Sequence, residues 1–468
     1  MPESPTRVSV LVVGGGLAGL AAAARAAELG SEVTLLDRSS NMGDGNTLTT
    51  TGLYTAGGLS PNTPPSELYN RVMAGGAAFP EPARAYADNC RRALQWLESV
   101  GIQVDRTGDG APYLESSSGV SEAPVYKTDV GANIVKKLRT FFHSHRGTST
   151  SNTRVVKLLK KKGNIVGVEA LDSAGKKLVI RTGAVVLATG GFQANRDLLK
   201  KYVGRYTEKA KLMGSSSDTG DGLKMAMNVG AKAVNLKYVY GRMVSMKALT
   251  DDRFWPYPTF ATLIDDGIVV DHSGRRFRDE GWGDIPIVNA LARGSDGTTA
   301  YLIFDEVAWE RAKGDADSLV RPNPWLLEKG GDIYKAESLT ELAAKLGIFA
   351  KTLDATFEEF NAAATRRRLG ELRVPRINNP APLKPPLYGV KMTAGIISTM
   401  GGPLIDKKMR VVSKKGTAIP GLYAAGDVVG GLMGGLNGGY IGGLSQAAVT
   451  GVIAGESANK FVSMSPFR

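Results

Sequence analysis

Three glycines near the start of the chain, Gly14, Gly16 and Gly19, have the spacing of a backbone loop that binds phosphate, and an acid, Asp37, follows them. Gly14 permits a tight turn, Gly16 lets the backbone approach a pyrophosphate, and Gly19 lets a helix pack closely on a strand. The acid stands close to the usual offset of about 20 residues for a carboxylate that binds a ribose hydroxyl. This pattern predicts a dinucleotide site, and by itself it is compatible with NAD or with FAD.

The segments around the glycines have the character that such a site needs. The apolar run Val10–Val13 predicts a buried strand that leads into the turn. The alanine-rich stretch Leu20–Leu29 predicts a helix that ends at Gly30. Because the free N–H groups and the positive dipole end of that helix face the turn, we expect them to bind phosphate.

A second glycine-rich segment, Ile419–Asp427, stands near the other end of the chain. It resembles the segment with which flavoproteins of the two-dinucleotide-fold type hold the ribityl chain of FAD by a carboxylate, here Asp427 after Gly426. The two segments together predict FAD. They also predict an α/β fold with a discontinuous Rossmann-like FAD-binding domain, because its two parts lie at opposite ends of the chain.

The composition fits a sizeable enzyme. The chain has 468 residues, and 58 Lys and Arg against 45 Asp and Glu give a formal net charge of +13. This charge suits an acidic substrate, an anionic surface or nucleic acid, but no basic tract with interleaved aromatic residues supports nucleic acid. Cys90 is the only cysteine, which excludes an internal disulfide and a cysteine metal cluster, and we expect no metal.

Neither a targeting signal nor a membrane span is evident. Residues 1–5 lack the basic and apolar regions of a signal peptide. The longest weakly charged stretch, 421–455, is rich in glycine and is interrupted by Asp427 and Asn437, which favours a cofactor loop over a transmembrane helix. We therefore expect a cytoplasmic protein without a transmembrane segment.

Local patterns divide the chain into three parts. Residues 1–234 are expected to form the first part of the FAD-binding domain, including a hairpin around Lys162–Asn164. Residues 235–366 are aromatic and proline-rich, then helical over 338–346 and 352–367, and we expect an inserted α+β cap that binds substrate. Residues 367–468 return to the FAD-binding domain through a proline-rich connector.

Seven spaced motifs cover nearly the whole chain and are similar to those of the fumarate reductase/succinate dehydrogenase flavoprotein superfamily. They are Gly14–Gly19, Asn46–Thr47, Ala188–Gly191, Gly220–Gly222, Gly274–Phe277, Thr399–Gly402 and Gly421–Asp427. Members include soluble fumarate and urocanate reductases, tricarballylate dehydrogenase and 3-ketosteroid dehydrogenases. The resemblance implies hydride transfer between flavin N5 and a carbon next to a carbonyl or carboxylate, so that a C=C bond is made or removed.

The resemblance also implies which residues hold FAD. Asp37 would bind the adenosine ribose, Val155 would lie beside the adenine, Asn46 and Thr47 near the pyrophosphate and isoalloxazine, and Asp427 at the ribityl chain. The other expected contacts are Leu17, Ala18, Arg38, Gly58, Thr189, Gly190, Asp221, Gly426, Gly443, Leu444 and Ser445. No histidine lies in 46–58, where succinate dehydrogenases carry covalent FAD, so we expect non-covalent FAD.

The chain departs from soluble fumarate reductases at their catalytic positions. Ser398 follows Ile397 where they have a histidine pair, and Arg242 lies in the cap stretch where they have a histidine. No arginine follows the Gly274–Phe277 motif at their proton-delivering position, and Tyr440 replaces a substrate-clamping arginine. We therefore exclude fumarate reductase itself and place the chain nearer the tricarballylate and 3-ketosteroid dehydrogenase branches, the second of which carries a tyrosine at this place.

Tyr440 is the main catalytic candidate. A phenol with a pKa near 10 is a poor base at neutral pH unless a cation or a helix N-terminus lowers that pKa. A helix predicted over 443–455 begins beside Tyr440, and Arg242 is predicted on the facing cap strand, so we expect both influences. A packing role for Tyr440 and a salt bridge in the cap for Arg242 stay open.

Two more residues complete the catalytic candidates. Ser398 would hydrogen-bond flavin or substrate, or else serve only as a turn residue. Arg278 would reach an anionic substrate, although charged runs are mostly solvated. Arg275 and Glu280, in the same stretch, are expected to form a structural network in the cap hinge.

Three functions are compatible with the sequence. The first is a desaturating dehydrogenase that acts on a CH–CH bond next to a carbonyl or carboxylate, in a small substrate that is either anionic or a cyclic ketone. The second is an ene-reductase of the urocanate/fumarate reductase type, fed by an external electron donor. The third is a non-catalytic flavin-binding protein, against which the complete set of cofactor signatures argues. The sequence leaves the direction, the substrate, the electron acceptor and the oligomeric state open.

Overall fold

The glycine turn at the start of the chain joins a strand to a helix, as the sequence predicts. Strand β1 (Thr6–Val13) ends at Gly14, and helix α1 (Leu17–Glu28) follows the turn. Gly14 has a φ of +106°, which favours glycine, and a Cβ at Gly19 would lie 1.8 Å from the Gly14 carbonyl oxygen. A glycine at position 19 therefore lets α1 pack against the end of β1.

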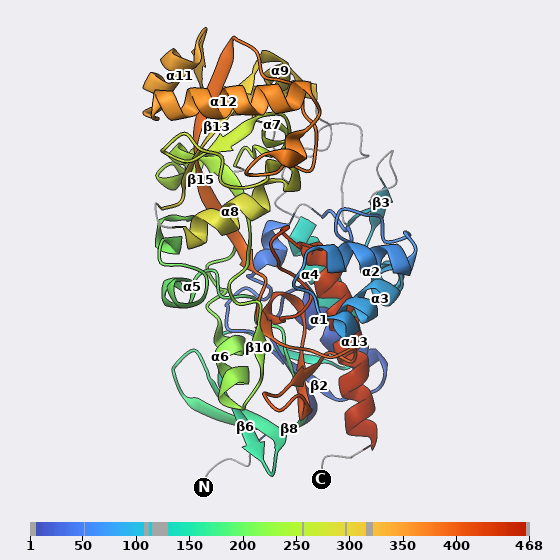
Figure 1. Cartoon of the computed structure of the whole chain (residues 1–468). Coiled ribbons are helices and arrows are strands. Elements are labelled where there is room, and N and C mark those ends of the chain that lie inside the picture. The colour runs from blue at the N-terminus through green and yellow to red at the C-terminus, as the bar shows by residue number, and fades with distance from the viewer. Residues whose placement is uncertain are drawn as a thin grey trace.

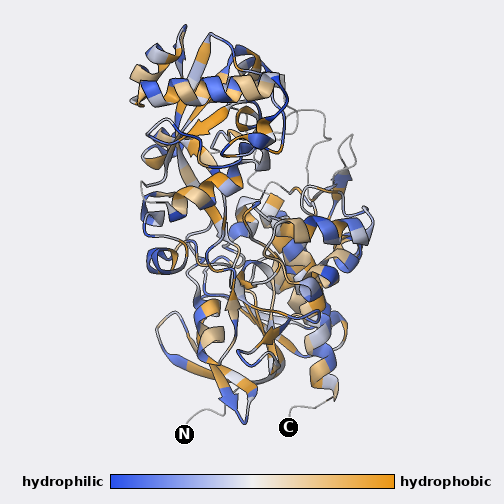
Figure 2. Cartoon of the chain, viewed as in Figure 1, coloured by the Kyte–Doolittle hydropathy of each residue, from blue (hydrophilic) through white to orange (hydrophobic). Residues whose placement is uncertain are grey.

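The computed structural model describes residues 6–464 apart from 51, 107–111, 115–129, 255–256, 295–296 and 315–321. These residues form an elongated molecule, with both termini in the lower part of the view and a second body of strands and helices above it (Figure 1). Apolar residues gather on the strands of both bodies and on the helix faces that cover them (Figure 2).

The lower body is built on an eight-stranded sheet. Its main path runs β17 (Arg410–Val412), β18 (Ala418–Ala424), β8 (Lys177–Leu187), β1, β2 (Val33–Leu36) and β5 (Thr148–Thr150), and the hairpin β6 (Arg154–Lys161)–β7 (Asn164–Leu171) joins it at β8. The strands from β18 to β5 along this path pair in parallel. Ligands bind beyond the carboxyl ends of such strands, which is the edge where the glycine turn lies.

Helices bring the two ends of the chain together on this sheet. Helix α13 (Gly443–Met464) packs along α1, and a Cβ at Gly451 would lie 2.5 Å from the Ala18 carbonyl oxygen. The other helices of the lower body and its border with the cap are α2 (Pro65–Ala74), α3 (Pro80–Ser99), α4 (Val130–Ser144), α5 (Arg196–Tyr202) and α6 (Asp221–Asn228). Two short strand pairs are β3 (Val104–Arg106) with β4 (Pro112–Leu114), and β10 (Ala233–Val234) with β16 (Gly402–Pro403).

The upper body, which we call the cap, contains a second sheet. Its order is β11 (Val239–Ser245), β15 (Leu387–Thr399), β13 (Thr299–Asp305) and β12 (Ile268–Val270), and β9 (Lys211–Leu212) and β14 (Tyr334–Ala336) also pair with β15. Two separate apolar clusters contain side chains of this sheet. The cap helices are α7 (Ala261–Asp266), α8 (Asp284–Arg293), α9 (Glu306–Gly314), α10 (Trp325–Glu328), α11 (Leu339–Leu346) and α12 (Ala350–Thr365).

The two sheets agree with the predicted fold class, a discontinuous α/β domain with an inserted α+β cap. The domain limits 1–234, 235–366 and 367–468 stay predictions, but the pairing of β15 bears on the second limit. This strand forms the middle of the cap sheet, between β11 and β13, although the sequence analysis gave residues 367–468 to the FAD-binding domain. The pairing favours a boundary after Thr399.

Candidate active site

A cavity of about 620 Å³ lies between the carboxyl edge of the large sheet and the cap. Predicted site residues from both ends of the chain and from the cap meet in its wall. They are Gly14, Gly16, Leu17, Ala18, Asp37, Arg38, Asn46, Thr47, Gly58, Val155, Thr189, Gly190, Asp221, Arg242, Ser398, Gly426, Asp427, Tyr440, Gly443 and Leu444. The structure thus brings together most residues that the sequence singles out, although they span more than 400 positions of the chain.

Asp37 organises the loops on one side of the cavity. Its carboxylate is 6% exposed and accepts hydrogen bonds from three backbone N–H groups: Gly15 at 2.7 Å, Ser39 at 2.8 Å and Gly43 at 3.2 Å. An ionised acceptor makes such bonds strong. Asp37 therefore ties the glycine turn to the loop after β2 and still lines the cavity.

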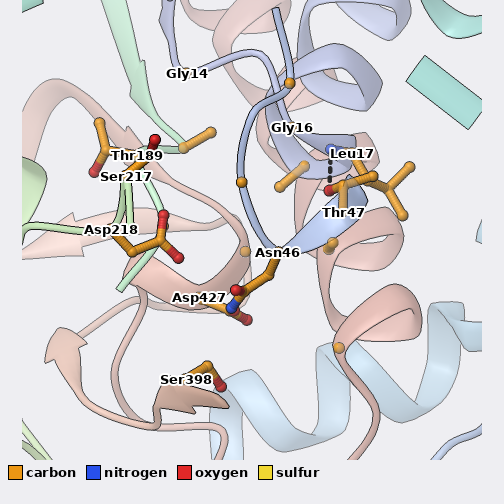
Figure 3. Close-up of a pocket in the computed structure, with 18 of the residues that line it drawn as sticks. Gly14, Gly16, Leu17, Asn46, Thr47, Thr189, Ser217, Asp218, Ser398 and Asp427 are labelled. Carbon is orange, nitrogen blue, oxygen red and sulfur yellow. Dashed lines mark hydrogen bonds between the residues drawn. The ribbon is translucent and has the colours of Figure 1, made fainter. Parts of the chain in front are cut away.

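The N-terminus of α1 faces the same space. The backbone N–H of Leu17 donates to Thr47 Oγ1 at 3.0 Å, the dashed line in Figure 3. Thr47 lies on the short helix η1 (Asn46–Thr49). A Cβ built on Gly16 meets only this hydroxyl, at 3.3 Å, so the backbone at Gly16 is open to the cavity. A positively polarised helix end of this kind is suited to bind a phosphate group.

Asn46 connects η1 with the segment that contains Asp427. Its amide Nδ2 donates to Asp427 Oδ2 at 3.1 Å and to the Ile397 carbonyl oxygen at 3.3 Å, while its Oδ1 accepts from the N–H of Ser215 at 2.8 Å. Asp427 lies on the short helix η7 (Gly426–Val428), and burial raises the pKa of this carboxyl.

A cluster of charged residues closes the end of the cavity near Val155. Arg154 forms a two-pronged pair with Asp221, at 2.8 and 2.9 Å, and Arg38 donates to Thr219 Oγ1 at 2.7 Å. Burial raises the pKa of Asp221, but the hydrogen bonds and charge of Arg154, helped by Arg38, leave that pKa below its usual value. The Asp221 carboxylate is therefore paired and ionised at neutral pH.

Two stacked tyrosines and an arginine form the end of the cavity next to the cap. The rings of Tyr240 and Tyr440 are parallel within 3° and their centroids are 3.7 Å apart. Tyr440 Oη accepts a hydrogen bond from the N–H of Gly443, the first residue of α13, at 2.7 Å. Arg242 lies over Tyr240, with its guanidinium carbon 5.6 Å from the ring centroid.

Arg242 is held by a buried acid. Its NH1 lies 2.9 Å from Oδ1 of Asp284, a residue that is 1% exposed, and Asp284 Oδ2 accepts from the N–H of Met243 at 3.2 Å. The charge of Asp284 raises the pKa of Arg242 above its usual value. Arg242 thus forms the salt bridge in the cap that the sequence analysis left open, and it also lines the cavity beside Tyr240.

The expected lowering of the Tyr440 pKa is wrong. Burial raises the pKa of this phenol well above 10, and the neighbouring Tyr240 and Asp427 raise it further. The Gly443 N–H and Arg242 act in the predicted direction, but burial outweighs them. The phenol is therefore protonated at neutral pH.

Three predicted residues do not line the cavity. Gly19 acts through the close contact of α1 with β1. Ser445 is fully buried; its hydroxyl donates to the Thr55 carbonyl oxygen at 2.6 Å and hydrogen-bonds with Tyr86 Oη at 2.7 Å. The guanidinium of Arg278 donates to the Leu436 carbonyl oxygen. The side chains of Ser445 and Arg278 hydrogen-bond to backbone carbonyl oxygens and do not line the cavity.

The sequence analysis missed Asp218, in the cavity wall, and Gln193, which holds it. Asp218 lines the cavity and is 4% exposed, and Gln193 donates to its Oδ2 at 2.6 Å. Figure 3 shows Asp218, Asn46 and Asp427 directed into the same part of the cavity. The only sequence signal was the position of Asp218 two residues before the Gly220–Gly222 motif, and a single acid in a loop is too common to indicate a site.

The polar atoms of the cavity fit a dinucleotide. Among the described residues, three buried side-chain atoms have no hydrogen-bond partner: Thr189 Oγ1, Gln193 Oε1 and Gln446 Oε1. Thr189 lines the cavity directly. A buried polar atom without a partner is rare and costly, so a bound group that supplies partners is expected here. Within the described part of the chain, no group of three His, Cys, Asp or Glu side chains could hold a metal ion.

Comparison with known proteins decides the family. Residues 9–442 match the family model described as FAD binding domain. The chain belongs to this family. The match confirms FAD as the cofactor of this flavoprotein, and it agrees with the open glycine turn, the helix end at Leu17 and the unpartnered Thr189 hydroxyl.

The relatives of this flavoprotein are oxidoreductases. A fumarate reductase (cytochrome) of Shewanella frigidimarina is 28% identical over 97% of this chain and 77% of its own length. An NADH:acrylate oxidoreductase of Vibrio harveyi is 29% identical over 79% of this chain, but the match spans only 36% of that longer protein. A 3-oxosteroid 1-dehydrogenase of Mycobacterium tuberculosis is 30% identical over 59% of this chain and 54% of its own.

A solved structure shows the same fold along the whole chain. The 3-ketosteroid-Δ4-(5α)-dehydrogenase of Rhodococcus jostii RHA1 superimposes with a TM-score of 0.74, at 23% identity, and covers 98% of both chains. The predicted superfamily and its oxidoreductase class are thus confirmed, while non-covalent attachment of FAD and cytoplasmic location stay predictions. No helix in the described ranges combines the length and apolar character needed to cross a membrane.

Replacement of Asp37 by Ala should weaken FAD binding by about 10- to 100-fold. Hydrogen bonds to a charged group contribute about 1.5–3 kcal/mol each, and about 1.4 kcal/mol is a factor of ten in affinity. The measurement is the FAD content and the dissociation constant of the purified variant. Asp172→Ala is the matched control, because Asp172 also accepts two backbone N–H bonds, from Ala174 and Lys176, but lies outside the cavity. Unchanged FAD binding in Asp37→Ala would remove the assigned role.

Proposed function

We propose that this flavoprotein reduces a C=C bond next to a carbonyl or carboxylate group of a small molecule, with electrons from an external donor. Bound FAD supplies the hydride. The observation that carries the proposal is the position of Tyr440. Its phenol lines the cavity beside the cap and its oxygen accepts a hydrogen bond from the first residue of α13, while burial raises its pKa.

A protonated phenol is the form that reduction needs. When hydride adds to one carbon of an activated C=C bond, the other carbon must receive a proton, and Tyr440 Oη–H can donate it. The phenolate left behind is stabilised by the Gly443 N–H and by the charge of Arg242. In the direction of dehydrogenation the same group must first lose its proton, which the raised pKa makes costly at neutral pH.

Arg242 binds negative charge and does not deliver the proton. Since Asp284 raises the pKa of the Arg242 guanidinium, this side chain stays charged under all ordinary conditions. Its guanidinium, about a third exposed, faces the cavity beside Tyr240. We assign to it the orientation of the activating carboxylate or carbonyl of the substrate, and the stabilisation of charge that develops there.

A desaturating dehydrogenase is the second candidate. It is favoured by the tyrosine at position 440, which resembles that of 3-ketosteroid dehydrogenases, and by the two contacts that stabilise its phenolate. A base role for Tyr440 requires alkaline pH or a substrate that lowers its pKa on binding. Activity that rises steeply with pH would therefore distinguish this candidate from the reductase.

The test is anaerobic and separates the two directions. The enzyme flavin is reduced with dithionite and offered α,β-unsaturated carboxylates and unsaturated 3-ketosteroids, and reoxidation of the flavin absorption band is followed. Reoxidation by one class supports the reductase and identifies the activating group. Bleaching of oxidised enzyme by a saturated partner, without the reverse reaction, would favour the dehydrogenase. If no compound changes the flavin absorption of either the reduced or the oxidised enzyme, the proposal is overturned.

A further inference from the structure

Two carboxyl groups in the cavity wall, those of Asp218 and Asp427, are linked through a chain of amides. Gln193 Nε2 donates to Asp218 Oδ2 at 2.6 Å and lies 3.5 Å from Asn46 Oδ1. Asn46 Nδ2 then donates to Asp427 Oδ2 at 3.1 Å. This chain fixes the positions of Asp218 and Asp427 and directs both into the space that FAD must fill (Figure 3).

No cation in the described part of the chain neutralises either carboxyl by an ion pair. Of the arginines that line the cavity, Arg154 and Arg38 are engaged with Asp221, and Arg242 is engaged with Asp284. The diphosphate of FAD brings two further negative charges into the same space. Like charges that share a buried site disfavour one another's ionisation and raise the pKa of a carboxyl among them.

Asp218 is the carboxyl best placed to give up its charge. Burial raises its pKa to about 7, and the charge of Asp427 on η7 adds to this. Hydrogen bonds from Gln193 and from the Gly191 N–H, and the charge of Arg38 after β2, oppose the rise.

Two other carboxylates near Asp218 accept hydrogen bonds from the residues on either side of it in the loop. Asp44, before η1, accepts from Ser217, and Asp221 on α6 accepts from Thr219. Neither carboxylate supplies the positive charge that Asp218 lacks.

We propose that Asp218 is a cofactor-binding residue that enters the FAD complex as a neutral carboxylic acid, so that each FAD bound takes up one proton from solvent. The proton adds to a carboxylate oxygen of Asp218, and no other bond changes. The inference rests on the FAD site alone and holds for either direction of the proposed reaction.

A neutral Asp218 would also provide a hydrogen-bond donor for the unpartnered amide oxygen of Gln193. Gln193 Oε1 is buried and lacks a donor while its nitrogen serves an ionised Asp218. If the carboxyl is protonated, a turn of the amide lets Oε1 accept the new O–H, and Nε2 then gives up its contacts with Asp218 and Asn46. The orientation of such an amide follows its hydrogen-bond partners. Protonation thus gives this buried oxygen a partner and removes one negative charge from the cavity.

The expected dependence on pH has a definite sign. Below about pH 7 Asp218 is already protonated in the free protein, and FAD affinity does not depend on this group. Above that value, binding must add the proton, so the dissociation constant should rise by up to tenfold per pH unit until the pKa of the complex is reached. The effect appears as weaker FAD binding in alkaline solution.

The test counts protons directly. FAD is removed reversibly, and the apoprotein is titrated with FAD by calorimetry at pH 8 in buffers of different ionisation enthalpy, and by flavin fluorescence from pH 6 to 9. We expect close to one proton taken up per FAD at pH 8. Asp218→Asn, which is neutral at every pH, should take up none and should bind FAD at pH 8 as tightly as at pH 6.

Two further variants keep the proposal falsifiable. Asp44→Asn removes an exposed acid from the same cavity wall and should keep the proton uptake. Asp427→Asn should shift the onset of the pH effect to lower pH, because the loss of a negative neighbour lowers the pKa of Asp218 in the free protein. Uptake that survives in Asp218→Asn and disappears in Asp427→Asn would place the proton on Asp427 and overturn the proposal. Wild-type protein that takes up no proton would overturn it as well, even if Asp218→Asn failed to fold.

Discussion

Replacement of Tyr440 by Phe should lower the rate of C=C reduction by about 10²- to 10⁴-fold, the usual contribution of a positioned general acid. The ring of Phe preserves the stacking on Tyr240 at 3.7 Å, so the change removes only the O–H group. FAD content should stay the same. The measurement is the rate of flavin reoxidation by the best unsaturated substrate under anaerobic conditions, with the substrate concentration varied to separate binding from turnover.

A control and a pH profile distinguish catalysis from packing. Tyr423→Phe also removes a buried hydroxyl, one that contacts the Ser457 carbonyl oxygen at 3.2 Å, but Tyr423 does not line the cavity. This control should keep the wild-type rate. Since burial raises the pKa of Tyr440 well above 10, the wild-type rate should not fall through neutral pH because of this group. A Tyr440→Phe enzyme that reduces substrate as fast as wild type would remove the acid role.

Local chemistry made the cofactor half of the site predictable. The glycine turn, the acid that follows it and the segment ending at Asp427 are each specified by a few adjacent residues. Short helices were equally readable: Ser338 caps α11 by accepting from the Glu341 N–H at 3.2 Å, where the sequence predicts a helix over 338–346. The hairpin β6–β7 also turns at Lys162 and Gly163, as predicted.

Contacts between distant segments could not be predicted in this way. Nothing in the run Leu387–Thr399 indicates that it pairs with β11 and β13 in the cap and not with the large sheet. The stacking of Tyr240 on Tyr440 and the amide chain from Asp218 to Asp427 join residues about 200 positions apart in sequence. The net pKa of Tyr440 depends on burial, which no local pattern reveals.

The predicted structural network in the cap hinge was right for one residue, Glu280, and wrong for the other, Arg275. Glu280 forms the expected structural pair, but the partner is Arg276 at 2.6 Å, while Arg275 is exposed. Arg376, two residues before the proline-rich connector 378–386, also lies 3.8 Å from Glu280. The sequence identified the acid correctly and the arginine wrongly, because only the fold decides which neighbour points inward.

Glu280 anchors the segment that positions Arg242. It is fully buried, and its Oε1 accepts from the Val269 N–H at 3.1 Å as well as from Arg276. Glu280 begins the short helix η5 (Glu280–Trp282), after which α8 starts at Asp284. Asp284, whose carboxylate holds Arg242, therefore stands in the chain just after a segment that this buried network fixes.

Replacement of Glu280 by Ala should destabilise the protein by about 3–5 kcal/mol, the usual result of removing one member of a buried ion pair. Two buried arginines lose an ion-pair partner: Arg276, with a side chain 6% exposed, and Arg376, whose side chain is fully buried. The measurement is denaturant unfolding of the FAD-bound protein. Glu341→Ala breaks an exposed pair with Lys345 and should change stability by less than about 1 kcal/mol. Equal losses of stability in the two variants would show that the buried network does not hold the cap. If Glu280→Ala keeps its FAD but loses C=C reduction, the defect lies in the position of Arg242.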